Sequence, residues 1–205
     1  MKCTHSEVFN FEGAIRGMRN PKNSWDRSDS YYENGVYILG PNDLQLATAL
    51  ISGGSEHRKF LRQIFVSVDI TAPLYIWSEL DTYKVGTTAD SQSTMHKLKD
   101  SPITLEGFEI EDLSNIKGFD EIRDAFIEAL EWLRQMYNST KDPAYWKEMK
   151  RWLPSAWLQT RTWTGNYEVL RSIYHQRKNH RLIEWRIICR WIESLPYAKE
   201  LIIGN

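Results

Sequence analysis

The chain has 205 residues, of which 41% are hydrophobic and 26% charged, a balance that excludes wholesale disorder and suits one packed domain over residues 1–205. Its 26 basic and 27 acidic residues give a net charge of −1, so no global field attracts a nucleic-acid backbone. Two cysteines are too few for a disulfide scaffold or a cysteine-based zinc site, and no stretch reaches the apolar length of a membrane helix, so we expect a cytoplasmic protein without a membrane or nucleic-acid partner.

The first third of the chain mixes a long loop with short regular elements. Residues 19–35 are dense in Asn, Ser, Asp and Gly, which favour turns, and they predict a long loop. A strand is expected at 36–39. Asn42 or Asp43 can then cap a helix that runs to about Ser52.

The next stretch combines a strand, a helix and a hydroxyl-rich segment. Residues 65–70 alternate apolar and polar side chains at the period of a half-buried strand, and Pro73 opens a helix. Residues 82–94 hold many threonines and serines and predict an irregular loop, of the kind that commonly binds ligands.

The second half is predicted to be helical. Apolar residues from 119 to 137 recur at three- and four-residue spacings, which predicts a packing helix. A short helix follows Pro143, and two more are expected at about 166–178 and 181–195. Helices therefore dominate, and the pattern predicts a helix-rich α+β fold.

Charge and aromatic residues are unevenly distributed. Residues 147–190 hold ten basic and three acidic side chains, which suits either a site for a small phosphorylated ligand or basic solvated helix faces. The chain also has nine tryptophans, most of which we expect in the core or at subunit interfaces.

Common catalytic motifs are missing from the sequence. The five histidines include no pair at metal-ligand spacing beside a glutamate base, so no metal site is predicted. The sequence contains neither a glycine-rich phosphate motif nor a Gly-x-Ser-x-Gly elbow. Catalytic residues therefore stay unassigned.

A C-terminal segment resembles the flavin-dependent thymidylate synthases. In that family a basic residue precedes a Leu-Pro pair by three positions, a Trp-Thr-x-Asn follows, and a Leu-Arg lies eleven positions past the Asn. This chain has Lys150 before Leu153-Pro154, then Trp163-Thr164-Gly165-Asn166, then Gln176-Arg177, and the spacing is kept without a gap.

A second matching segment lies upstream. There the family has a histidine, an alternating strand, a proline and a helix that leads into a signature beginning Arg-His-Arg. In this chain His57 occupies the histidine, Pro73 the proline, and the signature falls at residues 82–94. The resemblance implies the family's α+β fold, helix-rich with a small antiparallel sheet, and its homotetramer with shared sites.

The signature itself is largely replaced. Its basic triplet is Thr82-Tyr83-Lys84 here, the second upstream histidine is Gln63, and the arginine two past the Asn is Glu168. The remaining signature positions carry Thr87, Ala89, Asp90, Gln92 and Thr94.

The resemblance implies roles for the matching positions. Arg177 would pin the pyrimidine and Lys150 would serve the nucleotide. The substrate-binding set is then Lys150, Arg177, Lys84, Thr87, Asp90 and Gln92. The flavin-facing set is His57, Gln63, Tyr83 and Asn166.

The replacements weaken the expectation of a flavin. FAD carries a pyrophosphate, and the loss of two arginines and two histidines removes charge-assisted hydrogen bonds of about 1.5 to 3 kcal/mol each. FAD is therefore a possible cofactor that we expect to bind weakly or not at all. Lys84 and the hydroxyl side chains of the loop could still hold a nucleotide.

Three hypotheses follow. The leading one is a pyrimidine-nucleotide-binding protein, with dUMP as ligand, that is a diverged enzyme methylating or otherwise modifying it. The alternative is a non-catalytic nucleotide binder or sequestering protein on the same scaffold, and a structural tetramer without ligand is third. For individual residues, Lys150 and Arg177 could be charges at helix ends, His57 structural, and Asn166 a helix cap.

Overall fold

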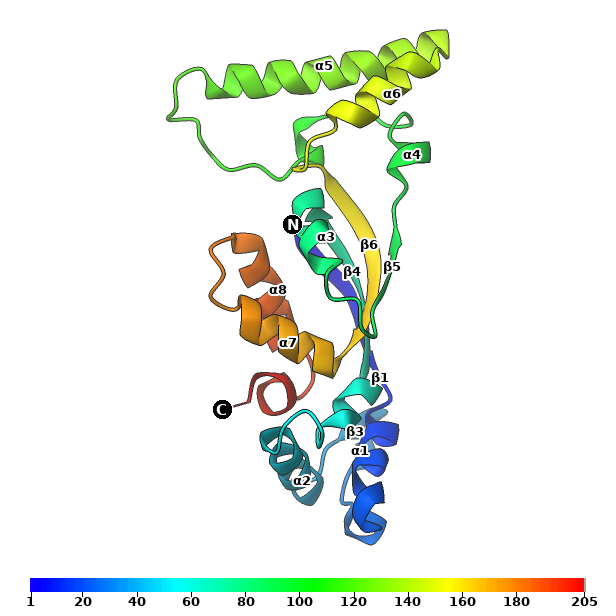
Figure 1. Ribbon diagram of the computed structural model, residues 1–205, viewed down its shortest axis with the longest axis vertical. Helices are drawn as coiled ribbons and strands as arrows, with labels where there is room; N and C mark the ends of the chain where they lie inside the picture. The colour runs from blue at the N-terminus through cyan, green and yellow to red at the C-terminus, as the bar shows by residue number, and fades with distance from the viewer. Residues whose placement is uncertain (205) are drawn as a thin grey trace. The chain divides into compact units, whose positions relative to one another are not determined.

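The computed structural model describes residues 1–204, the side chains of residues 95 and 96 excepted (Figure 1). The chain divides into two compact units. Unit 1 comprises residue 1 and residues 71–82 and 90–161, and unit 2 comprises residues 2–70, 83–89 and 162–204. The expectation of a single domain over 1–205 stays a prediction.

Helices dominate the described chain, as the sequence predicted. The strands are β1 (Lys2–Phe9), β2 (Tyr31–Glu33), β3 (Val36–Ile38), β4 (Phe65–Pro73), β5 (Thr88–Ser91) and β6 (Leu158–Asn166). The α-helices are α1 (Phe11–Arg19), α2 (Pro41–Ser52), α3 (Leu74–Leu80), α4 (Thr94–Lys97), α5 (Phe119–Thr140), α6 (Pro143–Trp152), α7 (Tyr167–Arg177) and α8 (Ile183–Glu193). Short helical turns include η3 (Lys59–Gln63) and a π-helix, η5 (Lys199–Ile203).

The sheet is small and antiparallel, with strand order β1-β4-β6-β5, so β1 and β5 are its edges. Along β4 the side chains of Val66, Val68 and Ile70 are buried while those between them are not, as the alternation predicted. A separate hairpin pairs β2 with β3. Its turn is Asn34-Gly35, and both residues have the positive φ that a two-residue hairpin turn requires.

Unit 2 is built around helices that bury one face each. On α1 the buried face is Phe11, Ala14, Ile15 and Met18. Helices α7 and α8, orange in Figure 1, pack against each other, and Trp185 on α8 is fully buried. This packing places the end of α7 beside the first turn of α8.

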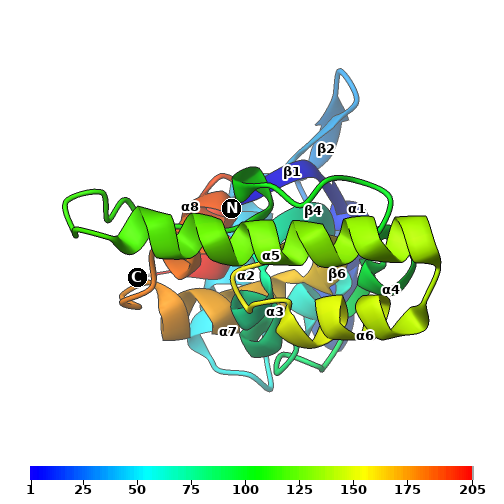
Figure 2. The ribbon, with the colours of Figure 1, turned by 90° about the horizontal axis from the view of Figure 1, so that it is seen from above.

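Unit 1 contains the helical hairpin of α5 and α6, which lie side by side in Figures 1 and 2. Beneath it is an apolar cluster that includes Ile127, Leu130 and Met149. Glu131 on α5 accepts hydrogen bonds from Arg134 at 2.6 and 2.7 Å and from the Ile103 amide at 2.8 Å. The hydrogen bonds from Arg134 are the main reason why the pKa of Glu131 falls to about 2.

Strands β1, β5 and β6 differ from the sequence-based expectation. Strand β1 was not predicted, because as an edge strand it has mostly exposed side chains and lacks an apolar alternation. Strand β6 was also missed, since its sequence is rich in Thr, Gln and Arg. Residues 88–91 form β5 inside the segment expected to be an irregular loop, so that expectation was wrong there.

The loop at 19–35 contains β2 and two 3-10 turns, so it is only partly irregular. The cap of α2 also differs from the prediction, because the helix begins at Pro41 with Gly40 as its N-cap. The carboxylate of Asp29 accepts the backbone N–H groups of Asn42 and Asp43 at 2.9 and 3.0 Å. The Asp29 side chain, from the loop, therefore accepts the free N–H groups at the start of α2, the role expected of Asn42 or Asp43.

Asp43 is fully buried and organises the loop. Its carboxylate accepts hydrogen bonds from Arg19 Nε at 2.5 Å, Ser28 Oγ at 2.7 Å and Ser30 Oγ at 2.6 Å. The backbone N–H groups of Asp29 and Ser30 add two more. Burial alone would raise the pKa of Asp43, but the hydrogen bonds outweigh it and hold the pKa below its ordinary value.

The tryptophans are not uniformly buried. Trp77, Trp163 and Trp185 lie in the core, whereas Trp25, Trp132 and Trp152 expose half or more of their surface. No helix in residues 1–204 is long and apolar enough to cross a membrane.

We predict that Asp43→Asn lowers the free energy of unfolding by about 3 kcal/mol or more, because it leaves the buried Arg19 without its charged partner. Chemical denaturation of both proteins measures the difference. The exposed neighbour Asp26 provides the control, and Asp26→Asn should change stability by less than about 0.5 kcal/mol.

The same pair predicts a pH dependence. The folded-state pKa of Asp43 is lowered. The ionised carboxylate therefore stabilises the fold at pH values above the ordinary pKa of 3.8, and this stabilisation is lost as the pH falls through the lowered pKa. The stability gap between wild type and Asp43→Asn should therefore narrow in acid. A gap that is constant with pH would contradict this assignment.

Candidate functional site

The candidate residues fall in both units. Those in unit 2 are His57, Gln63, Tyr83, Lys84, Thr87, Asn166 and Arg177. Those in unit 1 are Asp90, Gln92 and Lys150.

Arg177 is the last residue of α7 and is held by two aromatic side chains. Its guanidinium carbon lies 4.5 Å from the ring centroid of Trp185, within cation–π range, and Trp185 is fully buried. Its Nε donates to the Tyr83 hydroxyl at 3.0 Å, and that hydroxyl donates to Gln176 Oε1 at 2.9 Å. Stacking and the hydrogen bond together fix the plane of the guanidinium.

Tyr83 and Thr87 belong to a closed loop. The Thr87 hydroxyl donates to the Tyr83 carbonyl, so its contact is internal to the loop. Between them Gly86 has φ +74°, and a Cβ there would lie 2.8 Å from Asn166 Nδ2. Glycine is required for both reasons. Lys84 lies in the same loop and is exposed.

Asn166 is the N-cap of α7, as the structural alternative predicted. Its Oδ1 accepts the Val169 backbone N–H at 3.0 Å. Its Nδ2 faces Gly86 of the loop. Two positions later, the Glu168 carboxylate accepts from Arg58 Nε at 2.9 and 3.1 Å.

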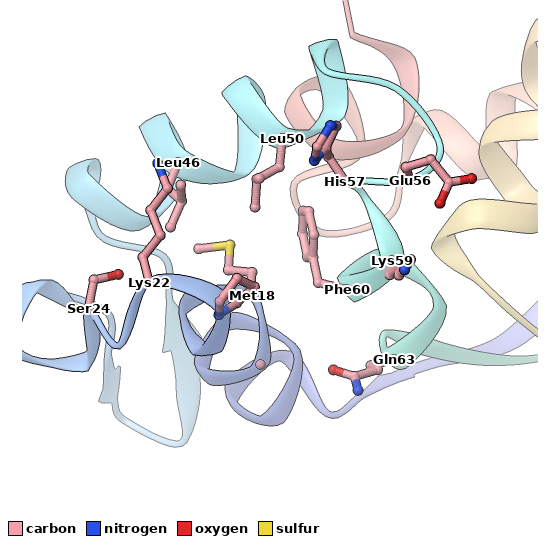
Figure 3. A pocket seen from close by; sticks show the side chains of 12 residues that line it. Met18, Lys22, Ser24, Leu46, Leu50, Glu56, His57, Lys59, Phe60 and Gln63 are labelled. Carbon is pink, nitrogen blue, oxygen red and sulfur yellow. The ribbon is translucent and has the colours of Figure 1, made fainter.

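His57 and Gln63 line a cavity of about 320 Å³ shown in Figure 3. Its apolar side chains come from α1, α2 and η3, namely Met18, Leu46, Leu50 and Phe60. Gln63 Oε1 lies 2.7 Å from the position of a Cβ on Gly17, so a larger residue there would push Gln63 away. The structure brings His57 and Gln63 to one cavity.

In unit 1, Lys150 lies in the last turn of α6 and is half-buried. Its Nζ donates to Thr94 Oγ1 at 2.6 Å, which links the two matched sequence segments. Burial lowers the pKa of Lys150. Lys150 is therefore a partly desolvated cation with a defined partner.

Asp90 and Gln92 lie on the β5 edge. Asp90 is exposed within β5. The Gln92 backbone N–H donates to the Thr160 carbonyl of β6 at 2.9 Å, and the Gln92 carbonyl accepts from the side-chain Nε2 of Gln159 at 2.7 Å. Because Asp90 and Gln92 are two residues apart along an extended chain, they share a face. Within the described residues, no three His, Cys, Asp or Glu side chains cluster as metal ligands.

Two aromatic contacts were missed from the sequence. The sequence predicted for Trp185, as for most of the tryptophans, only a place in the core or at a subunit interface, and the structure places it under Arg177. In unit 1 the Arg161 guanidinium lies 4.3 Å from the Trp77 ring centroid and is 3.0 Å from Asp81 Oδ1. No spacing rule in the sequence links either arginine to its tryptophan.

Comparisons with known proteins agree at the level of fold. No protein-family model and no curated protein sequence matches the chain. A crystal structure of the flavin-dependent thymidylate synthase ThyX from Helicobacter pylori, complexed with FAD and dUMP, has a TM-score of 0.73 at 15% identity and covers 98% of both chains. A second structure of that enzyme with FAD and dUMP has a TM-score of 0.72 at 15% identity and covers 98% of this chain and 97% of its own. The chain therefore has the fold of the flavin-dependent thymidylate synthases, as the two matching sequence segments predicted.

Proposed function

We propose that the protein binds a pyrimidine nucleotide such as dUMP, with Arg177 and Lys150 as the main charged contacts. The observation that carries the proposal is the geometry of Arg177, at a position where the resemblance implies a pyrimidine contact. The similar structures hold dUMP, which makes a nucleotide the natural ligand to test.

Arg177 is suited to hold a planar or anionic group. Its guanidinium is stacked on Trp185 and oriented through Nε by Tyr83, so little side-chain entropy remains to be lost on binding. A guanidinium held in this way brings a permanent positive charge of fixed orientation to a phosphate.

Lys150 supports the proposal through its partial burial. A charge with less water around it interacts more strongly with an incoming phosphate than an exposed lysine does. The last turn of a helix also favours a cation by itself, so the location alone has a structural explanation. The hydrogen bond to Thr94 distinguishes Lys150 from the exposed Lys147 on the same helix.

The flavin-facing positions do not fit FAD. The Asn166 carboxamide oxygen caps α7, and the Tyr83 hydroxyl is engaged by Arg177 and Gln176. Glu168 places a carboxylate, paired with Arg58, where the family has an arginine. These positions offer a pyrophosphate fewer charged donors, and no chemical step is assigned to a flavin.

This mismatch favours the second candidate, a non-catalytic nucleotide binder or sequestering protein. A diverged enzyme that methylates or otherwise modifies dUMP remains the alternative that the resemblance suggests. Conversion of dUMP to a product distinguishes the diverged enzyme from the non-catalytic binder.

A homotetramer in the cytoplasm completes the proposal. In unit 1 the side chains of Ile122, Trp132 and Trp152 expose from 53% to 73% of their surface, which suits a protein–protein contact.

We predict that Arg177→Ala and Lys150→Ala each weaken dUMP binding by roughly 1.5 to 3 kcal/mol, or about ten- to a hundredfold, because each removes a charge-assisted contact. Calorimetric titration of dUMP and dTMP measures this. Tyr83→Phe should give a smaller loss, since Trp185 still stacks on the guanidinium.

The matched controls are Lys147→Ala, which removes an exposed cation on α6, and Arg181→Ala, which removes an exposed cation between α7 and α8. Both should leave dUMP binding unchanged. Thermal unfolding of each variant controls for the packing of the arginine stem. If dUMP fails to bind the wild type at millimolar concentration, the proposed function is wrong.

The flavin is tested separately. We predict that purified protein lacks the absorbance near ~450 nm of a bound flavin, because the charged contacts to FAD are replaced. Turnover of dUMP with FAD, NADPH and a folate donor supplied should be undetectable. A stoichiometric, tightly held FAD or product formation would restore the enzyme hypothesis.

The oligomeric state has its own measurement. Light scattering should give about four times the chain mass of 24.2 kDa. A monomer at micromolar concentration would remove the tetramer and any site formed between chains.

A further inference from the structure

A wide hollow of about 850 Å³ lies in unit 2 beside the cavity of Figure 3. The hollow and the cavity share Lys22, Ser24 and Leu46 among their lining residues, so they form one groove. Figure 3 shows the Lys22 side chain extending toward Leu46 of α2. None of the residues that the resemblance assigns to nucleotide or flavin lines this second space, which we call the basic hollow.

The basic hollow carries a positive charge. Arg19, Lys22 and Arg27 line it against one carboxylate, Asp26. The charge of Arg19 is balanced by the buried Asp43, so Lys22 and Arg27 face the single remaining carboxylate, Asp26, and the local charge stays positive. Neither of these two forms an ion pair with any residue that the structure describes, and both are exposed. An anion bound here would interact with two unpaired cations, and because both are exposed, little water would have to be removed from them.

Neutral donors surround the cations. Asn23, Asn42 and Gln45, which have carboxamide side chains, line the same hollow. Arg19 Nη2 is buried and has no hydrogen-bond partner within the described chain, and Arg19 is part of the wall. Donors that converge from several elements suit a group with many oxygens, such as a phosphate or pyrophosphate, better than a single carboxylate.

We propose that the basic hollow is a subsite for the phosphate of a small molecule whose apolar part lies in the adjoining cavity. Lys22 and Arg27 would contact the phosphate, and Met18, Leu50 and Phe60 would contact the apolar part. The inference does not rest on the proposed function, because Arg177 and Lys150 do not line this groove.

Inorganic pyrophosphate is the first probe, titrated by calorimetry into the full chain. We expect binding at millimolar concentration or below, and Lys22→Ala and Arg27→Ala should each weaken it about tenfold. Arg16→Ala removes an exposed cation from α1 that does not line the hollow, and should change the affinity by less than about twofold. Absence of binding, or equal weakening by Arg16→Ala, would overturn the proposal.

Two further probes define the ligand class. Citrate offers carboxylates in place of phosphate and should bind more weakly than pyrophosphate, and equal affinity would contradict the assignment to phosphate. 1-Naphthyl phosphate should bind more tightly than methyl phosphate, because its ring reaches the cavity. Equal affinities of these two would remove the apolar half of the proposal.

Arg177→Ala separates this inference from the nucleotide proposal. It should leave pyrophosphate binding unchanged while it weakens dUMP binding. Loss of pyrophosphate affinity in this variant would place the anion at Arg177 and overturn the subsite.

Discussion

A buried carboxylate, Asp43, governs the arrangement of one end of unit 2. A charge without water must be surrounded by donors, and Asp43 gathers them from α1 and from the loop that precedes β2. This gathering brings Asp29 to the start of α2, where it caps the helix. The same constraint fixes Arg19 and Ser24, and with them one wall of the groove.

A second constraint acts at the start of α7. Asn166 caps the helix with its oxygen while its nitrogen faces Gly86, so the loop of Tyr83 can approach only because residue 86 has no side chain. That approach puts the Tyr83 hydroxyl within reach of Arg177. The orientation of the proposed nucleotide contact thus depends on a cap and a glycine that are not themselves contacts.

The replaced signature positions have acquired partners within the protein. Glu168 pairs with Arg58, Tyr83 with Arg177 and Gln176, and Thr94 with Lys150. A scaffold that lost its flavin contacts by drift alone would be expected to leave polar groups poorly satisfied. The observed pairing instead satisfies these polar groups within the protein, in unit 2 at Glu168 and Tyr83 and in unit 1 at Thr94.

The sequence by itself determined helices α5 to α8 and the strand at 65–70, because hydrophobic periodicity is a local property of the chain. Through the family resemblance that Lys150, Asn166 and Arg177 carry, the sequence also implied the fold. It did not reveal β1 and β6, since an edge strand and a polar strand carry no apolar alternation. It also gave no sign that Trp185 lies under Arg177, or that Lys22 and Arg27 line one hollow with Asn42 and Gln45. Those juxtapositions were decided only by the tertiary structure, because they join side chains from elements whose relative placement depends on packing and on the buried charge of Asp43.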